Sequence, residues 1–461
     1  MVCLLAVTVL LLFNGCSAAG IQQIQNTFGR FNENLFQADN DGKDNSNIIS
    51  QNSGASSTAE EKKGKVQNFK CISNELFSGN SVVKKTVSEP MASVSQNNVA
   101  SHKENYQNLP ARAEKDLYDE IDKNICRVSD HKSVDGYYPV NRITIPEKIS
   151  EAESHVAISA YTCDNPQIFW VAGSYGYMSS GNKTAIQLYS AFSPNECNAK
   201  TKRLNSATKS LFQSIPSGLN DFEREEYLFD YLIKHCTYDE TAGNNSWLSY
   251  TAYGAIVDGK AVCEGYSRAM QLLAGYAGIP CTLVSGSYNG EGHMWNLIKI
   301  GGYWYHLDVT WCDTSIPIYN YYNVSDKIIQ QTHSVYKAVS ALPASAVQSG
   351  QFNIFHPKCS SVKDNYFRRK GIEVTSVKYS VDSAQEKVLA AKMKAGKSSI
   401  AFSIYGDYDK TVSCMTKQKP YLLDLWLASA EKASNRKIDL SNVSFVTDKP
   451  DRGLTLFIRY R

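Results

Sequence analysis

The spacing of apolar and polar residues separates a long polar segment from the rest of the chain. From about 20 to 110, stretches such as "ADNDGKDNSNIISQNSGASSTAEEKKGKV" are rich in Asn, Gln, Ser and Lys, with few aromatic or branched apolar residues. Such a segment cannot bury enough apolar surface to offset the entropy that it would lose on ordering. We therefore predict a disordered tether at 20–110 and folded units after it.

Helical and strand-like patterns alternate in the folded part. Between 111 and 204, "YDEIDKNI" and "SEAESHVAISAYTCDNP" predict helices, and "QIFWVAGSYGYMS" and "TAIQLYSAF" predict strands, which together form a small α+β unit. The segment after Asn220 predicts a helix with that residue as its N-cap. From 375 to 461, strand, helix, strand, helix and two closing strands predict a separate α+β domain. A core at 205–374 lies between these two units.

One helix of the core has a particularly regular apolar pattern. Its apolar and aromatic residues recur at intervals of four and three: Val262, Tyr266, Ala269, Leu273 and Tyr276. This spacing predicts a helix that buries one side and ends near Ala277, before Gly278 and Pro280. If the helix begins near Val262, Cys263 lies in its first turn, where unpaired N–H groups and the helix dipole favour a thiolate. An N-cap at Asp258 would place Cys263 one turn later and weaken that effect.

A β-hairpin follows in "GHMWNLIKIGGYWYHLDVTW", with Gly301 and Gly302 as its two-residue loop. The loop fixes the register, so that His293 is predicted to face Thr310. Side chains alternate along a strand, so His293 and Asp308 share one face of the hairpin. As diagonal neighbours their Cα atoms lie about 7–8 Å apart, within reach of each other's side chains.

These residue types suit thiol chemistry. A cysteine nucleophile needs an imidazole to take and return its proton, and a carboxylate to orient that imidazole. We therefore predict Cys263 as the nucleophile, His293 as general base and acid, and Asp308 as the residue that orients His293.

Other candidates are given structural roles. His306 shares the face of Asp308, opposite Leu297, and is predicted to be a packed strand histidine. Cys281 and Cys312 are predicted to pack or to form a disulfide. The remaining histidines without an assigned partner are predicted to lie at the surface or to cap elements: His235, His333 and His356. The tyrosine-rich "PIYNYYNVSD" packs at the edge of the core or lines a cleft.

No metal or cofactor is predicted. The twelve cysteines include no C-x-x-C pair, which argues against a zinc knuckle or a thioredoxin-like site. The stretch "QADNDG" from Gln37 lacks a first carboxylate and has Ile48 where a calcium loop needs glutamate. The net charge of +3, without a Lys/Arg block, argues against nucleic acid as a partner.

The first residues, "MVCLLAVTVLLLFNGCSAAG", contain an apolar run that is too short to span a bilayer but fits a secretory signal. We therefore expect residues 1–19 to be a signal and the protein to be extracellular or on the cell surface. Two alternatives stay open: lipidation of Cys16 in "FNGC", which would anchor the protein to a membrane, or ordinary cleavage after Ala19. Export would permit disulfides among the remaining cysteines.

Three separated blocks resemble the transglutaminase-like superfamily, and in particular bacterial secreted or cell-surface proteins that carry this domain. They are "AYGAIVDGKAVCEGYSRAMQLLAGYAGIPCTLVSG", "GHMWNLIKIGGYWYHLDVTWCD" and "YYNVSD", within 205–340. The resemblance implies a papain-like α+β core with a Cys263–His293–Asp308 triad. It also implies an oxyanion hole that combines the cysteine N–H with an upstream side chain, for which Trp247 is a candidate. The calcium loop of the animal enzymes and the cysteine zinc ligands of the peptide-glycanase branch are absent.

The predicted function is an exported, thiol-dependent acyl-transfer enzyme that acts on protein or peptide amides. The acceptor is water in a protease or deamidase and an amine in a transglutaminase. The alternative is a catalytically silent surface protein that uses this fold to bind a ligand, which the long tether and the extra C-terminal domain would suit. The substrate's identity, the oligomeric state and the role of the C-terminal domain stay open.

Overall fold

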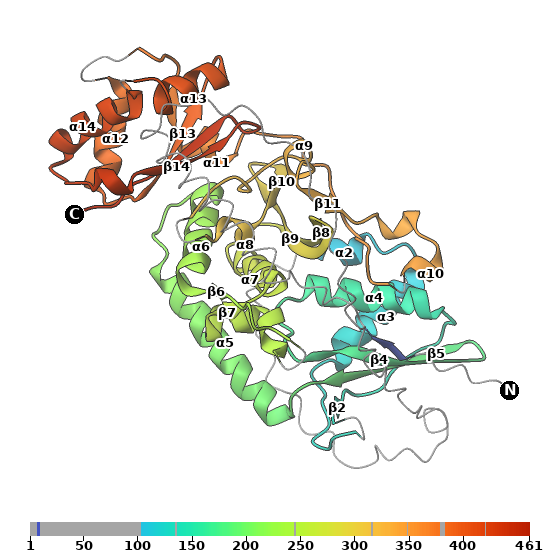
Figure 1. The fold of residues 1–461 in the computed structure, drawn as a ribbon. Helices are drawn as coiled ribbons and strands as arrows, with labels where there is room; N and C mark the ends of the chain where they lie inside the picture. The colour runs from blue at the N-terminus through green and yellow to red at the C-terminus, as the bar shows by residue number, and fades with distance from the viewer. Residues whose placement is uncertain are drawn as a thin grey trace, which may run out of the picture.

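The computed structural model of the protein describes residues 7–9, 103–133, 136–243, 246–314, 317–347, 349–378, 383–419 and 421–461. The predicted signal at 1–19, apart from 7–9, and the predicted tether as far as 102 lie outside the described residues. Helices and strands are mixed along the chain, and strands of each main sheet pair largely in antiparallel fashion, so the fold class is α+β, as predicted (Figure 1). No helix among the described residues has the length and apolar character needed to cross a membrane.

The N-terminal unit is a sheet covered by helices. Its central strands are β4 (Val171–Ser180) and β5 (Lys183–Ser190); β5 also pairs with β2 (Tyr138–Pro139) and β3 (Ile143–Ile145), and β4 with β1 (Val7–Val9). Three helices belong to this unit: α2 (Glu104–Gln107), α3 (Arg112–Asn124) and α4 (Glu151–Asp164). Helix α4 begins with a capping box, in which Ser150 and Glu153 bond to each other's backbone N–H groups.

Residues 103–110, the last of the predicted tether, are folded in the structure. Asn105 donates to Asp164 Oδ1 through its backbone nitrogen at 3.1 Å and through Nδ2 at 2.8 Å, and Tyr106 N donates to Asp164 Oδ2 at 2.9 Å. These residues order through bonds to one buried carboxylate. Their composition, on which the prediction rested, does not reveal such bonds.

The boundary predicted at 204/205 falls inside a helix. Helix α5 (Pro194–Ser214) runs through it and is followed by α6 (Asp221–His235), whose predicted N-cap, Asn220, accepts from Glu223 N at 3.1 Å. One continuous hydrophobic core joins the N-terminal unit to the segment that follows, from Leu117 through Leu273 to Phe367. The two predicted units therefore share their interior.

The core carries a four-stranded antiparallel sheet in the order β10-β9-β8-β11. These strands are β8 (Cys281–Tyr288), β9 (Glu291–Ile300), β10 (Tyr303–Leu307) and β11 (His333–Val335). Short elements precede helix α7 (Cys263–Tyr276): β6 (Thr237–Tyr238), η3 (Trp247–Tyr250), η4 (Gly254–Asp258) and β7 (Lys260–Ala261). Short helices follow the hairpin: α8 (Val309–Cys312), α9 (Asp326–Ile329), η5 (Val339–Ala341), α10 (Ala344–Val347) and α11 (Tyr366–Lys370).

Helix α7 has the predicted extent, but it is buried on all sides, whereas the sequence predicted that one side is buried. It begins after Val262 and ends before Ala277, yet every residue from Cys263 to Gly275 is buried. The sheet packs on the helix through β8 and β9, and the N-terminal unit bonds to it through α4. There Arg268 Nη1 donates to the carbonyl of Thr162 and Gln271 Nε2 to that of Cys163, both at 2.7 Å. The helix is therefore enclosed rather than amphipathic.

Gly265 shows how tightly α7 is enclosed. A Cβ at this position would lie 2.4 Å from the backbone oxygen of Ser249 and 2.8 Å from Cβ of Ala261. We expect Gly265→Ala to lower the free energy of unfolding by about 2–3 kcal/mol, because backbone must move to make room. Urea denaturation measures this loss. In Gly243→Ala the new Cβ meets no atom within 4 Å, so a similar loss in that control would contradict the steric explanation.

The C-terminal unit has a hydrophobic core of its own and forms a separate lobe, orange to red in Figure 1. Its sheet has the order β12-β13-β15-β14, with β12 (Ile372–Val374), β13 (Ser399–Ile404), β14 (Ser444–Asp448) and β15 (Gly453–Phe457). Its helices are α12 (Ala384–Lys394), α13 (Tyr408–Thr416), α14 (Leu422–Ser434) and η6 (Leu440–Asn442). The sequence did not predict α13, and β12 places the start of this unit before 375.

Candidate active site

Cys263 is the first residue of α7. Its N-cap, Val262, is extended, with φ −93° and ψ 179°. The sequence left two positions open for Cys263, and the structure places it in the first turn of the helix. There the backbone N–H groups lack intrahelical partners and the helix dipole favours negative charge. The residue is 1% exposed.

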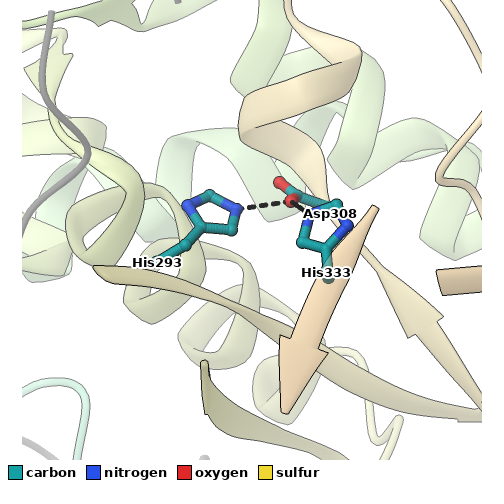
Figure 2. Close-up of side chains that lie close together, drawn as sticks. All are labelled: His293, Asp308 and His333. Atoms are coloured by element: carbon teal, nitrogen blue, oxygen red, sulfur yellow. Dashed lines mark hydrogen bonds and ion pairs between the residues drawn. The ribbon is translucent and has the colours of Figure 1, made fainter. Parts of the chain in front are cut away.

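The hairpin brings His293 and Asp308 together. Its register runs from Tyr303↔Ile300 to Leu307↔Asn296, as the Gly-Gly loop predicts. The pairing predicted beyond Leu307 was wrong: the chain leaves the sheet at Asp308, whose Oδ1 accepts from Trp311 N at 3.1 Å and caps α8. The carboxylate nevertheless reaches its predicted partner, with 2.5 Å between His293 Nε2 and Asp308 Oδ2 (Figure 2).

His293 also forms a side-chain hydrogen bond with Cys263. Because Nε2 faces Asp308, Nδ1 is the nitrogen that remains for the thiol. Burial lowers the pKa of His293, but the charge and hydrogen bond of Asp308, together with Cys263, outweigh burial and raise the pKa to about 10. An imidazole that keeps its proton at neutral pH beside a thiol is the environment in which a thiolate is stabilised.

His333 is a member of this cluster that the sequence did not predict. Its Nε2 lies 3.2 Å from Asp308 Oδ2, and the residue is 2% exposed. The predicted surface or capping role was therefore wrong. His333 belongs to the three-residue strand β11, which pairs with β8 at Tyr288. A strand so short, paired across a long connection, leaves no periodic signal in the sequence.

Asp308 is ionised and fully buried. Burial alone would raise the pKa of its carboxyl, but His293 and His333 act in the opposite direction and hold the pKa below its usual range. Aromatic rings surround the pair: Trp295 stacks on His293 at 5.6 Å between centroids, and Trp311 meets it edge-on at 6.1 Å. These rings exclude water, which strengthens the attraction between the buried charges.

His306 has the structural role predicted for it. It faces Leu297 in the hairpin and is fully buried. Its Nε2 lies 2.9 Å from Asp326 Oδ1, and its Nδ1 accepts from Trp295 Nε1 at 2.9 Å. Since an indole nitrogen only donates, Nδ1 carries no proton and Nε2 does. His306 is therefore held in one neutral tautomer, away from the thiol.

The other candidates also have local partners. Cys281 and Cys312 are buried, burial raises the pKa of both thiols, and none of the nine cysteines in the described part of the chain forms a disulfide. Their packing role is confirmed and their disulfide is not formed. His235 Nδ1 bonds to Tyr231 O at 2.9 Å at the end of α6, whereas His356 is half-buried, 5.7 Å from the ring of His306.

Trp247, the candidate for the oxyanion hole, has its side-chain N–H bonded elsewhere in the structure. Its Nε1 donates to the carbonyl of Phe169 at 2.6 Å, so this N–H is engaged within the protein.

Trp247 lines a cavity of about 40 Å³ with Glu264 and Arg268. Glu264 Oε1 accepts from Arg268 Nε at 2.8 Å; burial raises the pKa of Glu264 to about 7 although Arg268 opposes this. The cavity has room for a few waters and not for a peptide.

Two clusters among the described residues bring metal-ligand atoms within 4.8 Å of one another: His293, Asp308 and His333, and His306, Asp326 and Cys359. In the first, a metal at His293 Nε2 would have to displace a proton with a pKa of about 10. In the second, the Trp295 bond places the proton of His306 on Nε2, the nitrogen that faces the cluster. Neither donor set favours a resident ion.

Residues 209–309 match the family described as the transglutaminase-like superfamily. The chain contains a transglutaminase-like domain. Cys263, His293 and Asp308 all lie within the matched residues, and His333 lies beyond them. The chain is similar to part of the kyphoscoliosis peptidase of Mus musculus, with 27% identity over 23% of this chain and 18% of that protein. The chain thus matches less than a fifth of that relative's length.

Two solved structures are also similar to the chain that carries the transglutaminase-like domain. One is a TGase, with 15% identity, a TM-score of 0.24 and coverage of 44% of this chain and 59% of the other. The other is a candidate cysteine protease from Cytophaga hutchinsonii, with 14% identity, a TM-score of 0.22 and coverage of 34% and 59%. At these TM-scores neither structure bears on function.

Proposed function

We propose that the protein is a thiol-dependent acyl-transfer enzyme that acts on amide bonds of proteins or peptides. The observation that carries this proposal is the buried series Cys263, His293 and Asp308, in which His293 bonds to both of the others. The series begins at the N-terminus of α7, where a thiolate is favoured.

The reaction uses these three residues in turn. The thiolate of Cys263 attacks the amide carbon, and backbone N–H groups of the first turn of α7 stabilise the oxyanion. The C–N bond breaks, His293 gives its proton to the leaving nitrogen, and a thioester remains. His293 then takes a proton from the acceptor as it attacks the thioester, which restores the thiolate. Asp308 holds the imidazole in position throughout.

Both acceptors fit this cycle. Water as the acceptor gives a protease or deamidase, and a primary amine gives a transglutaminase. The thiol is 1% exposed and aromatic rings lie around the imidazole. A site from which water is excluded lets an amine compete with hydrolysis. A peptide library assayed with and without an added amine distinguishes the two products.

We expect Cys263 to react with iodoacetamide at about pH 6 at least about tenfold faster than the other cysteines of the described part of the chain, because its thiol bonds to the imidazolium of His293. Burial raises the pKa of the Cys126 thiol to about 11 and that of the Cys281 thiol above its usual value. Cys414 is partly exposed and serves as the accessible reference thiol. Mass-spectrometric mapping of the modified sites measures the rates. Labelling of Cys263 no faster than Cys414 would favour a silent binding protein.

A further inference from the structure

The carboxylate of Asp308 has two further hydrogen-bond partners besides His293. Oδ2 accepts from His293 Nε2 at 2.5 Å and lies 3.2 Å from His333 Nε2, while Oδ1 accepts from Trp311 N at 3.1 Å. Both histidine side chains are fully buried. In Figure 2 the imidazole rings of His293 and His333 both lie beside the same carboxylate, with 5.4 Å between the ring centroids. The orientation of Asp308 is therefore fixed by His333 as well as by His293.

We propose that His333 is a positioning residue of the site, which holds Asp308 ionised and aimed at His293. Its effect on catalysis rests on the proposed function. His333 lies outside the residues that match the family, 209–309, so the family match does not include it.

The surroundings of His333 determine its proton state. An ionised carboxylate only accepts, so the proton of His333 lies on Nε2, and Nδ1 accepts from Thr332 Oγ1 at 2.8 Å. Burial lowers the pKa of His333; Asp308 raises it, and the charge of His293 lowers it again, so that the net shift is downward. The other titratable side chains around it are Tyr288 and Tyr321, both 5.1 Å away between ring centroids, and His306. His333 is thus a neutral donor near pH 7.

The two histidines on Asp308 therefore have different tasks. His293 bonds to Cys263 on its other side and exchanges protons with the reacting groups. His333 bonds to Thr332 on its other side and has no partner among these groups to which it could pass a proton. Its N–H stays on the carboxylate while His293 gains and loses a proton, so Asp308 keeps its charge and direction through the cycle.

Two substitutions of His333 test this role. His333→Phe removes the N–H and keeps a ring; His333→Gln returns an N–H donor at a similar reach but cannot titrate. We expect His333→Phe to lower kcat about 10- to 100-fold, as expected for the loss of one hydrogen bond to a charged group, with KM nearly unchanged. His333→Gln should stay within about threefold of the wild type.

The pH profile separates positioning from simple support of the fold. Loss of the His333 donor raises the pKa of Asp308, so Asp308 stabilises the His293 imidazolium less well. The His293 imidazolium then loses its proton at a lower pH, and the basic limb of kcat/KM moves down by about one pH unit in His333→Phe. His306→Phe is the matched control: it removes another buried histidine, whose Nε2 bonds to Asp326 and not to Asp308. It should lower stability without moving the basic limb.

Alkylation of Cys263 by iodoacetamide, followed against pH, measures the same limb without turnover, because the reactivity of the thiolate changes when the imidazolium beside it loses its proton. If the wild-type thiol is not activated, the proposed function fails. If it is activated and the limb is the same in wild type and folded His333→Phe, only the role of His333 is overturned. Failure of His333→Gln to restore the limb, or an equal shift in His306→Phe, also overturns it. Circular dichroism and urea midpoints establish that each variant is folded.

Discussion

Replacement of Cys263 by alanine should abolish acyl transfer while the protein stays folded. The nucleophile itself is removed, and loss of a catalytic nucleophile lowers kcat by at least about 10⁴-fold. Cys263 is 1% exposed at the start of a helix that is buried on all sides. Deletion of one sulfur atom there should cost roughly 1–2 kcal/mol of unfolding free energy. Turnover of peptide amides and urea denaturation measure the two effects.

Cys281→Ala is the control for this experiment. Cys281 is also a buried cysteine, and it lies on β8 beside α7. This variant should show a similar loss of stability and keep its turnover. If Cys263→Ala retained the ligand affinity and biological effect of the wild type, the protein would be a binding or scaffold protein with a silent site.

Asp308→Asn should give the second large effect, because it removes the charge on which both histidines depend. An amide would present an N–H either to the imidazole of His293 or to the backbone N–H of Trp311, where acceptors are needed. We expect kcat to fall by about 10³- to 10⁴-fold, as when a buried aspartate no longer fixes a catalytic imidazole. The unfolding free energy should fall by about 3–5 kcal/mol, since a buried ion pair loses one partner.

The change of unfolding free energy with pH tests the same substitution, because the pKa values of Asp308 and His293 shift in opposite directions. The pKa of Asp308 is lowered in the folded protein, so the aspartate stabilises the fold above its unfolded value of about 3.9, and this contribution is lost as the pH falls toward the folded value. The pKa of His293 is raised to about 10, so its contribution is complete below about pH 6.5 and declines as the pH rises to about 10. Asp308→Asn should flatten both dependences in urea titrations across pH.

Asp326→Asn is the matched control for the aspartate. Asp326, at the start of α9, bonds to Nε2 of His306, which lies in the same sheet as His293. Its side chain is partly exposed, with 24% of it accessible. We expect it to lose less stability and to keep its turnover. An Asp308→Asn variant with turnover within tenfold of the wild type would mean that His293 needs no buried charge.

The sequence predicted the parts of the site that follow from local spacing. The apolar stripe around Tyr266 located α7 and placed Cys263 near its start, and the Gly301-Gly302 loop fixed the register of the hairpin down to Leu307. Both signals come from residues within about one element of each other. They were sufficient to bring His293 and Asp308 together.

Contacts between distant segments could not be predicted in this way. Asp308 leaves the strand because its carboxylate caps α8, and the apolar pattern is compatible with strand as well as helix there. His333 reaches the same carboxylate through β11, a strand of three residues. Asn105 is ordered by a bond to Asp164, across 59 residues of the chain. Each depends on polar contacts, which have no periodicity in the sequence.

Helix α7 belongs to the segment that matches the family, but it is enclosed partly by residues outside that segment. Arg268 and Gln271 donate to the carbonyls of Thr162 and Cys163, which lie well before residue 209, where the family match begins. The matched segment therefore does not enclose its own central helix: without the preceding layer, Arg268 and Gln271 would lose these two partners. Recombination that moves this segment between proteins must carry the preceding α+β layer with it or supply a substitute.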